Sequence, residues 1–504
     1  MRRYPVGIQD FSEVRKGGYV YVDKTKFIDK LFWHGKYYFL SRPRRFGKSL
    51  FLSTLDYLFQ AKQSLFEGLY IDDKWDWTKT NPIIKISFSN IDHKGMGLMR
   101  AIEVELGKIA TKYGIVLQST TIGASFRELI ESLFERHGSV VVLIDEYDKP
   151  IIDYLGTDTP KAVENRETLK AFYSILKDAD PYLKLVFITG VSKFSRVSIF
   201  SDLNNLKDLS NDTTFESICG ISQEELERNF VEELQIYDPE KIKKWYNGYS
   251  WGGQASVYNP FSLLNFFSGD GQYRNYWFET GTPTFLINLA KGQQIYDFEH
   301  VKMPLSALGA YDLDRLQIVP LMFQTGYLTI THYIEEDDLY ELGYPNEEVR
   351  KSFLIFLADS YTNQNEPNIV LATELRNALK VADIKKVESI INTVFKCIPY
   401  EIWQRENEHY YHAIIHLTFR LLGIYIESQV QTSDGRIDAL VQTPNYVYAF
   451  EFKLDGSASE ALQQVKDKGY LMPYQHQGKI CIGIGINFSV ETKKVQALLW
   501  EEIK

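Results

Sequence analysis

LSRPRRFGKSLF, residues 40–51, is the stretch from which the fold of the N-terminal half follows. It ends in Gly47-Lys48-Ser49, the last three residues of the phosphate-loop pattern G-x-x-x-x-G-K-[ST]. The first glycine of that pattern would stand at position 42, where this chain has Arg42. The stretch is therefore either a nucleotide site with an altered loop or a chance Gly-Lys-Ser in a basic turn.

The segments on both sides of this stretch have the order that a phosphate loop needs. KYYFLSR (36–42) predicts a short buried strand, and leucines at helical spacing predict a helix from Lys48 to about residue 60. In that arrangement, backbone N–H groups and the helix dipole point at a bound phosphate. We expect Lys48 to contact the terminal phosphates of ATP and Ser49 to bind Mg²⁺. The expected nucleotide-binding residues are Arg45, Phe46, Gly47, Lys48, Ser49, Leu50 and Asp145.

A second motif, VVVLIDEYD (140–148), places Asp145 and Glu146 at the end of an apolar strand. Open α/β sheets bind ligands at the carboxyl ends of their strands. Asp145 would hold the Mg²⁺, and Glu146 would act as the general base toward a water. Acids at a solvated strand end are common, but two motifs in register with the strand pattern favour a nucleotide site. We expect the strand predicted at 82–90 to lie between the strands of the two motifs.

The loop after the next apolar run, YLKLVFITG (182–190), also carries polar and basic groups. In one interpretation Thr189, Ser192 or Lys193 senses the γ-phosphate and Arg196 completes the site. In the alternative interpretation, the segment is an ordinary loop at the end of a strand and has no role in binding.

Near-continuous apolar runs that alternate with helices predict a parallel sheet with helices on both faces. The fold class is therefore α/β, with a P-loop domain of the ASCE type over residues 1–222. A mostly helical middle region, for which a winged helix or a lid is one interpretation, is expected over 223–395. The order α-β-β-β-α-β then predicts a second α/β core over 396–504.

The composition sets the general class. The 504 residues correspond to about three domains at roughly 150 residues each. A net charge of −10 argues against a basic coat for nucleic acid, although local basic patches are compatible with it. Three separated cysteines predict a reducing compartment and no zinc site. No signal core and no apolar run of about 18 residues is present, so we expect a cytoplasmic protein without a membrane partner.

The tail contains a second constellation, formed by Asp438, Glu451 and Lys453 in GRIDALVQTPNYVYAFEFKLDG (435–456). Glu451 and Lys453 share one face of a predicted strand, and a hairpin would bring Asp438 beside them. Two carboxylates and an ammonium suit a Mg²⁺ site for phosphodiester hydrolysis. An edge strand with alternating polar residues is the alternative.

Two other patterns in the tail are weaker. His412 and His416 stand one helical turn apart, as zinc ligands do, but no third ligand is evident and a partly buried helix face is favoured. GIGIN (483–487) lacks the third glycine of a dinucleotide loop. Neither pattern is expected to bind a cofactor.

Together these motifs resemble a bacterial family that joins an AAA-ATPase-like region to a C-terminal PD-(D/E)XK nuclease-superfamily domain. The phosphate loop of this chain, RPRRFGKSL, resembles that of the family, including the loss of the first glycine. The resemblance implies that Asp438, Glu451 and Lys453 form the nuclease triad. It adds Gln464 on the following helix as a catalytic residue and Glu408 on the first core helix as a further metal ligand. The matching segments are YPVGIQDFSEVRKGGYVYVDKTKFIDKL (4–31), LIDEYDKPI, TGVSKFS, GRIDAL and EFKLDGSASEALQQVKDKGY.

The sequence thus predicts an ATP-binding protein and ATPase coupled to a Mg²⁺-dependent nuclease acting on nucleic acid, with DNA as the expected substrate. Anti-phage defence or control of mobile elements would be a suitable setting, and a homo-oligomer is expected. The alternative is a non-enzymatic switch, in which ATP drives assembly and the tail only binds nucleic acid or a partner.

Overall fold

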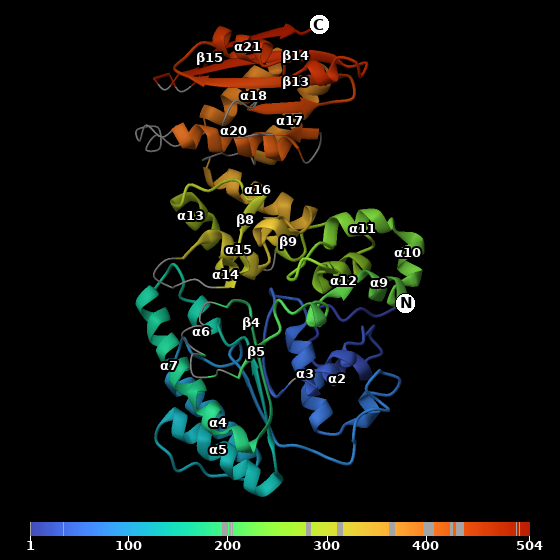
Figure 1. The fold of residues 1–504 in the computed structure, drawn as a ribbon, viewed down its shortest axis with the longest axis vertical. Coiled ribbons are helices and arrows are strands. Elements are labelled where there is room, and N and C mark those ends of the chain that lie inside the picture. The colour runs from blue at the N-terminus through green and yellow to red at the C-terminus, as the bar shows by residue number, and fades with distance from the viewer. Residues whose placement is uncertain are drawn as a thin grey trace. The chain divides into compact units, whose positions relative to one another are not determined.

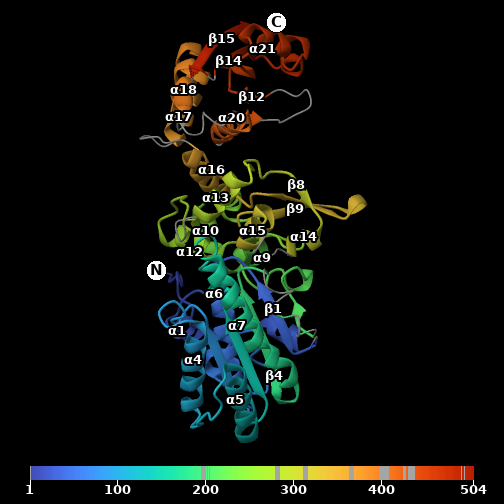
Figure 2. The ribbon, with the colours of Figure 1, turned by 90° about the vertical axis from the view of Figure 1, so that its left-hand side faces the viewer.

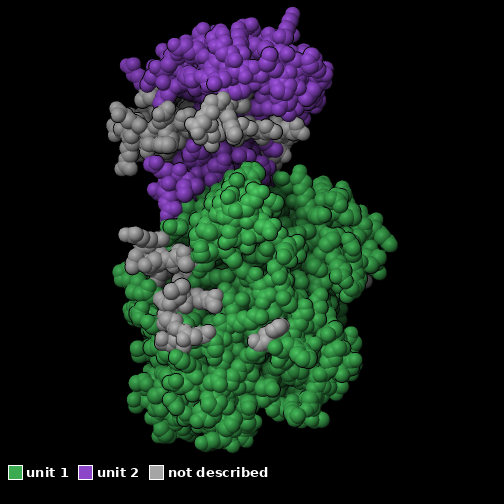
Figure 3. Space-filling model, in the orientation of Figure 1, with its two compact units in different colours: residues 1–285, 298–349 green, residues 286–297, 350–504 purple. Residues whose placement is uncertain are grey.

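The computed structural model describes residues 2–33, 35–193, 200, 203, 205–278, 284–309, 316–361, 368–396, 408–423, 427–429, 438–489, 491–492 and 494–504. For 395–396, 408–412 and 427–429 it describes the backbone alone. The chain divides into two compact units, coloured separately in Figure 3. Unit 1 comprises residues 1–285 and 298–349, and unit 2 comprises 286–297 and 350–504.

Unit 1 contains a five-stranded parallel sheet in the order β2-β3-β4-β1-β5. Figure 1 shows α4, α5 and α7 on one side of this sheet and α2 and α3 on the other. This arrangement confirms the predicted α/β class. The strands are β1 (Tyr37–Ser41), β2 (Ile83–Ser87), β3 (Val140–Asp145), β4 (Leu183–Gly190) and β5 (Lys207–Asp208). The helices are α1 (Phe11–Lys16), α2 (Thr25–Phe32), α3 (Lys48–Phe59), α4 (Leu98–Lys112), α5 (Ile122–His137), α6 (Lys149–Ile152) and α7 (Thr159–Asp178).

The predicted place of β2 is wrong. β4 lies between β1 and β3, and β2 lies at the sheet edge beyond β3. The burial of the strands explains this order, because β4 is buried along almost its whole length whereas Lys85 and Ser87 of β2 are half-buried. Lys85 pairs with Asp56 of α3 at 3.1 Å, as suits an edge strand. Chain order alone does not indicate this, since each crossover helix lets the chain pass over a sheet position.

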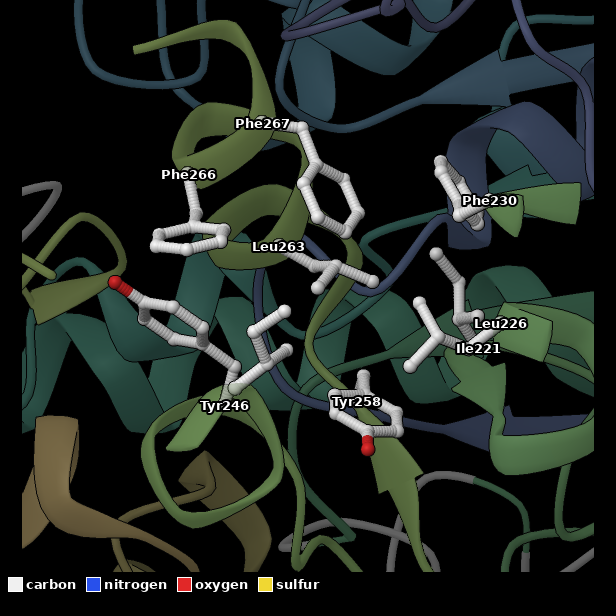
Figure 4. Packing of buried hydrophobic residues seen from close by; sticks show 9 residues of the cluster. Ile221, Leu226, Phe230, Tyr246, Tyr258, Leu263, Phe266 and Phe267 are labelled. Atoms are coloured by element: carbon white, nitrogen blue, oxygen red, sulfur yellow. The ribbon is translucent and has the colours of Figure 1, made fainter. Parts of the chain in front are cut away.

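Four short helices of unit 1 pack around an aromatic cluster, shown in Figure 4. They are α9 (Gln223–Asn229), α10 (Val231–Ile236), α11 (Pro239–Tyr246) and α12 (Pro260–Ser268). Ser222 begins α9 with a capping box completed by Glu225. Tyr4, Val20 and Val22 pack against the same cluster, so the start of the chain is held beside α12.

The rest of unit 1 adds a small antiparallel sheet in the order β8-β10-β9. Its strand β9 begins at residue 329, because α15 runs to Thr325 and Gly326 ends this helix in the left-handed conformation. The elements are α14 (Leu305–Gly309), α15 (Ile318–Thr325), β8 (Val301–Met303), β9 (Thr329–Ile334) and β10 (Leu339–Gly343).

Unit 2 is built on the sheet β11-β12-β13-β14-β15. Figure 2 shows α17 and α18 on one side of it and α21 on the other. Its strands are β11 (Glu427–Gln429), β12 (Ala439–Gln442), β13 (Tyr446–Leu454), β14 (Ile480–Ser489) and β15 (Lys494–Glu502). Its helices include α13 (Thr284–Gly292), α16 (Glu347–Tyr361), α17 (Asn368–Lys380), α18 (Ile384–Lys396), α20 (Glu408–Leu422) and α21 (Ala458–Asp467), of which α13 and α16 begin in unit 1.

The sequence did not predict β15, which pairs antiparallel with β14. Its segment KVQALLWEE lacks the alternation of a half-buried strand, since Leu499 and Trp500 are both exposed. The remaining predicted order of unit 2 is observed.

The glycines of GIGIN allow α21 to lie close to β14. A Cβ at Gly485 would collide with the backbone of α21 at Ala458 and Leu462, and one at Gly483 would crowd Leu462 and Val465. The segment is therefore a sheet strand whose glycines allow close helix packing. The close approach carries Gln464 of α21 toward β13.

Candidate functional site

The phosphate loop connects β1 to α3 and lines a cavity of about 340 Å³. Gly47 begins α3 with φ +95°, a conformation that suits glycine. Arg45 also has a positive φ of 67°, which is unusual for a residue with a side chain. The cavity is lined by Pro5, Val6, Gly7, Ile8, Gln9, Arg44, Arg45, Gly47, Lys48, Ser49, Leu50, Ser89, Glu146, Lys149, Pro260, Phe261 and Leu264.

The structure brings together the two residues predicted to bind Mg²⁺. The Ser49 hydroxyl donates to Asp145 Oδ2 at 2.6 Å, and Thr189 donates to Asp145 Oδ1 at 2.6 Å. Thr189 therefore orients the carboxylate from β4, the strand that lies beside β3. A hydroxyl and a carboxylate at a strand end suit Mg²⁺, which prefers oxygen ligands. The residues present fit the metal that the sequence predicts.

Lys48 lies inside the loop and is buried. Its ammonium donates to the carbonyl oxygens of Arg42 at 2.8 Å and Pro43 at 2.9 Å. Burial lowers the pKa of Lys48, while Glu146 and Asp145 act in the opposite direction. The ammonium is thus positioned among the backbone groups that would surround a phosphate.

Glu146 follows Asp145 on the cavity surface in a left-handed conformation, with φ 51°. Its carboxylate accepts a hydrogen bond from Ser89, just after the end of β2. Non-glycine residues in this conformation cluster at functional sites. The sequence did not indicate Ser89, because its role depends on β2 lying next to β3.

Arg42 does not line the cavity. Its side chain is fully buried, and its guanidinium carbon lies 4.0 Å from the ring centre of Trp251. Its N–H groups donate to four backbone carbonyls, those of Ser41, Ser210, Phe215 and Glu216, at 2.7–3.3 Å. Burial lowers its pKa to about 10. Where phosphate loops have a glycine, this chain has a buried arginine that joins the end of β1 to the segment after β5.

Arg44 and Arg45 have a different position from Arg42, because both line the cavity. The guanidinium of Arg45 lies 5.1 Å from the ring centre of Phe261, which begins α12 with Pro260. Trp277 donates to the carbonyl of Arg44 at 3.0 Å. The loop is therefore in contact with α12 and with Trp277, which follow the parallel sheet in the chain.

The other residues named from this part of the sequence are placed as follows. Phe46 is buried against Tyr249 and Trp251 and does not line the cavity, whereas Leu50 does. Ser192 donates to the buried Asp148 at 2.7 Å, and Lys193 pairs with Asp208 at 3.2 Å. Neither Ser192 nor Lys193 lines the cavity. Arg196 lies outside the described residues.

In unit 2, the predicted nuclease residues come together. The hairpin of β12 and β13 places Asp438 next to Glu451, and Asp438 accepts the N–H of Phe452 at 2.8 Å. Gln464 of α21 donates to Glu451 and accepts from Lys453 at 2.7 Å. The ammonium of Lys453 lies 3.8 Å from Glu451. Gln464 thus connects the carboxylate and the ammonium.

Glu451 is buried, with 3% of its surface exposed. Burial and the neighbouring Asp438 raise its pKa to about 7, against the opposing effect of Lys453. Among the described residues, its Oε2 atom has no hydrogen-bond partner. A buried, unpaired carboxylate oxygen beside a second carboxylate is what a divalent cation would satisfy, so these residues fit Mg²⁺.

The metal site is not complete on described residues alone. No group of three or more His, Cys, Asp or Glu side chains converges in the described part of the chain. Glu408 begins α20, and its side chain is outside the described residues. The sequence did not indicate Tyr470 as part of this site. The pKa of Tyr470 is raised by burial and by the neighbouring charge of Glu451. Its position depends on the packing of the segment after α21.

The histidines of α20 do not form a zinc site on the described residues. His416 is buried, and its Nε2 lies 3.6 Å from Asp297 and 3.4 Å from Arg420. The side chain of His412 is outside the described residues. No helix among the described residues has the length and apolar character needed to cross a membrane.

Comparison with known proteins finds a family for each of the two regions that contain these residues. A family described as Predicted AAA-ATPase matches residues 5–200, and the PD-(D/E)XK nuclease superfamily matches residues 406–497. The chain is 40% identical over 522 residues to an uncharacterized protein in the vnfD 5' region of Azotobacter chroococcum mcd 1, a match that covers 100% of this chain and 99% of that protein.

The chain belongs to the AAA-ATPase-like family with a PD-(D/E)XK tail. The resemblance stated from the motifs is thereby confirmed. No solved structure matches the chain. Membership in this family supports ATPase and nuclease-like activities, and the roles of the individual residues stay predictions.

Replacing Arg42 by lysine is expected to destabilise unit 1 by roughly 3 kcal/mol, because an ammonium cannot reach the four carbonyls that the guanidinium pairs. Differential scanning calorimetry of the full chain measures the effect. Arg44→Lys is the control, since the Arg44 side chain lines the open cavity. Equal stability of the two variants would contradict the structural role of Arg42.

Glu451→Gln is expected to stabilise the metal-free protein at pH 8 and to have little effect at pH 4. The pKa of Glu451 is about 7 in the folded chain against an ordinary value of 4.5. Between these values the folded chain keeps a proton that the unfolded chain has lost, so stability falls as pH rises through this window. The gain at pH 8 has an upper limit of about 3 kcal/mol.

Thermal unfolding with EDTA across pH 4 to 8 measures this difference. The exposed Glu460 of α21 provides the control, as Glu460→Gln. A stability difference between Glu451→Gln and the unchanged protein that is independent of pH would refute the raised pKa.

Proposed function

We propose that this protein binds and hydrolyses ATP at the phosphate-loop cavity, and that its tail is a Mg²⁺-dependent nuclease. The observation that carries the first part is the arrangement of Lys48, Ser49 and Glu146 around one cavity beside the start of α3, with the buried Asp145 hydrogen-bonded to Ser49. The second part rests on the contacts among Asp438, Glu451, Lys453 and Gln464.

In the first site, the N–H groups at the start of α3 and the ammonium of Lys48 would bind the phosphates. Ser49 and Asp145 would hold the Mg²⁺, which neutralises charge on the phosphate oxygens when bound. Glu146 would take a proton from a water whose oxygen attacks the γ-phosphorus, and the bond to the ADP oxygen breaks. The hydrogen bond from Ser89 to one oxygen of Glu146 would hold the carboxylate in place, and its other oxygen would accept the proton of the water.

The apolar part of the cavity lining suits the base of a nucleotide. Pro5, Val6 and Ile8 come from the start of the chain, and Pro260 and Leu264 come from α12. These apolar side chains would bury the faces of a planar base. These apolar side chains and the phosphate loop line the same cavity, which supports a whole nucleotide as the ligand.

In the tail, Asp438 and Glu451 would hold Mg²⁺, whose bound water is more acidic than free water. Lys453 would orient the attacking water and stabilise charge on the phosphate, and Gln464 would keep Lys453 beside Glu451. The water oxygen attacks phosphorus while a P–O ester bond breaks. We propose DNA as the substrate, ATP as the signal that controls cleavage, and a homo-oligomer as the active form. Defence against foreign DNA is the proposed setting.

Lys453→Ala is expected to abolish Mg²⁺-dependent cleavage of labelled DNA and to leave ATP affinity unchanged, because the two sites use different residues. Cleavage of DNA and RNA, with and without ATP and Mg²⁺, is followed on gels. Lys468→Ala, at the end of α21, is the control that removes a lysine outside the site. Undiminished cleavage by Lys453→Ala would remove the nuclease assignment.

Glu146→Gln is expected to lower steady ATP hydrolysis at least 100-fold while ATP still binds, because the amide cannot accept the proton of the attacking water; about two orders of magnitude is typical for a general base. Released phosphate and calorimetric binding are the two measurements. Lys48→Ala should instead lose binding. If the unchanged protein binds ATP but releases no phosphate, the non-enzymatic switch becomes the better description.

A further inference from the structure

The cavity has a cation that the phosphate-loop pattern does not include. Lys149, the first residue of α6, lines the cavity together with Lys48, Ser49 and Glu146. Its backbone N–H donates to the carbonyl of Glu146 at 3.0 Å, so its backbone is held one turn beyond the proposed general base. Lys149 therefore lies close to Glu146 on the cavity lining.

The ammonium of Lys149 is held by a carboxylate one helical turn further along. It lies 3.1 Å and 3.2 Å from the two oxygens of Asp153. Asp153 also pairs with Lys94 at 3.1 Å, and His93 Nε2 lies 3.4 Å from the same carboxylate. Although burial alone would raise the pKa of Asp153, its contacts with His93, Lys149 and Lys94 hold it well below its usual range.

This surplus of partners makes Lys149 easy to release. Removing one partner from a buried ion pair is costly when the remaining charge has no other partner. Asp153 would keep Lys94 and His93, so its carboxylate would stay paired when Lys149 turns away. The Lys149 side chain is 28% exposed and has a flexible four-carbon stem. It can therefore change partners at low cost.

The charges on the cavity surface indicate which partner would attract it. Among the described residues that line the cavity, Arg44, Arg45, Lys48 and Lys149 are basic and Glu146 is acidic. Lys48 already lies within the loop, where the β- and γ-phosphates are bound in phosphate-loop proteins. A nucleoside triphosphate differs from a diphosphate by its γ-phosphate, which adds negative charge. In this cavity the γ-phosphate would lie next to Glu146.

We propose that Lys149 turns from Asp153 to the γ-phosphate of a bound nucleoside triphosphate, so that the cavity distinguishes triphosphate from diphosphate. This inference rests on the proposed nucleotide binding. It makes Lys149 a residue of nucleotide specificity and Asp153 the residue that positions its ammonium when no triphosphate is bound.

The test compares Lys149→Met, which keeps the length of the stem and removes the charge, with the unchanged protein. Calorimetry with Mg²⁺ gives the Kd of a non-hydrolysable ATP analogue and of ADP. We expect the affinity for the ATP analogue to fall about tenfold, as for the loss of one charge-assisted hydrogen bond, and the affinity for ADP to stay within about twofold. An unchanged ratio of the two affinities would overturn the proposal, because Lys149 would then be a structural ion pair alone.

Lys94→Met is the matched control. It removes the other lysine of Asp153, and Lys94 does not line the cavity. Its two affinities should therefore match those of the unchanged protein. If Lys94→Met lowers triphosphate affinity as much as Lys149→Met does, the effect passes through Asp153 and the contact with phosphate is refuted.

A further arm separates this inference from the proposed function. If the unchanged protein binds neither nucleotide, nucleotide binding and the role of Lys149 both fail. A second outcome is that both nucleotides bind, that Lys48→Ala binds neither, and that Lys149→Met keeps the original ratio of affinities. In that case nucleotide binding stands, and only the role of Lys149 is refuted.

Discussion

Hydrogen bonds to a buried guanidinium organise the phosphate loop. The Nη1 and Nη2 groups of Arg42 donate to four backbone carbonyls, and the guanidinium lies over the face of Trp251, whereas its Nε has no hydrogen-bond partner among the described residues. These partners come from the end of β1, the segment after β5 and the loop before β7 (Val257–Tyr258). The loop thus gains contacts that a glycine at this position could not make. Arg44 and Arg45 are then directed to the cavity, where nucleotide phosphates would be bound.

The two sites differ in how their buried charges are paired. Around the phosphate loop, Lys48, Asp145 and Asp148 all have hydrogen-bond partners within unit 1. In unit 2, one oxygen of Glu451 lacks a partner among the described residues, and the pKa of this carboxyl is raised. The first site is therefore organised before a ligand arrives, whereas the second would gain stability from a cation. The second site is the one in which metal and proton would compete at neutral pH.

Prediction from the sequence succeeded where the signal was local. The strand, loop and helix around Lys48, the acids at the end of β3 and the hairpin that carries Asp438 and Glu451 each lie within a short segment. Prediction failed for β2, because burial of whole strands sets the order of a sheet, and for β15, because its apolar residues are exposed. Ser89 was missed because it reaches Glu146 through the long-range pairing of β2 with β3. Lys149 was missed although it is close to Glu146 in the chain, because the phosphate-loop pattern includes no cation at this position.

The sequence by itself determined the element types and the chemistry at each motif, because hydrophobic spacing and residue type are local properties of the chain. It therefore indicated both the phosphate loop and the carboxylate triad. Only the tertiary structure decided which groups meet. It placed Thr189 on Asp145, Ser89 on Glu146 and Gln464 between Glu451 and Lys453. Each of these contacts joins residues from different elements, so its formation depends on how the strands and helices pack and not on their separate sequences.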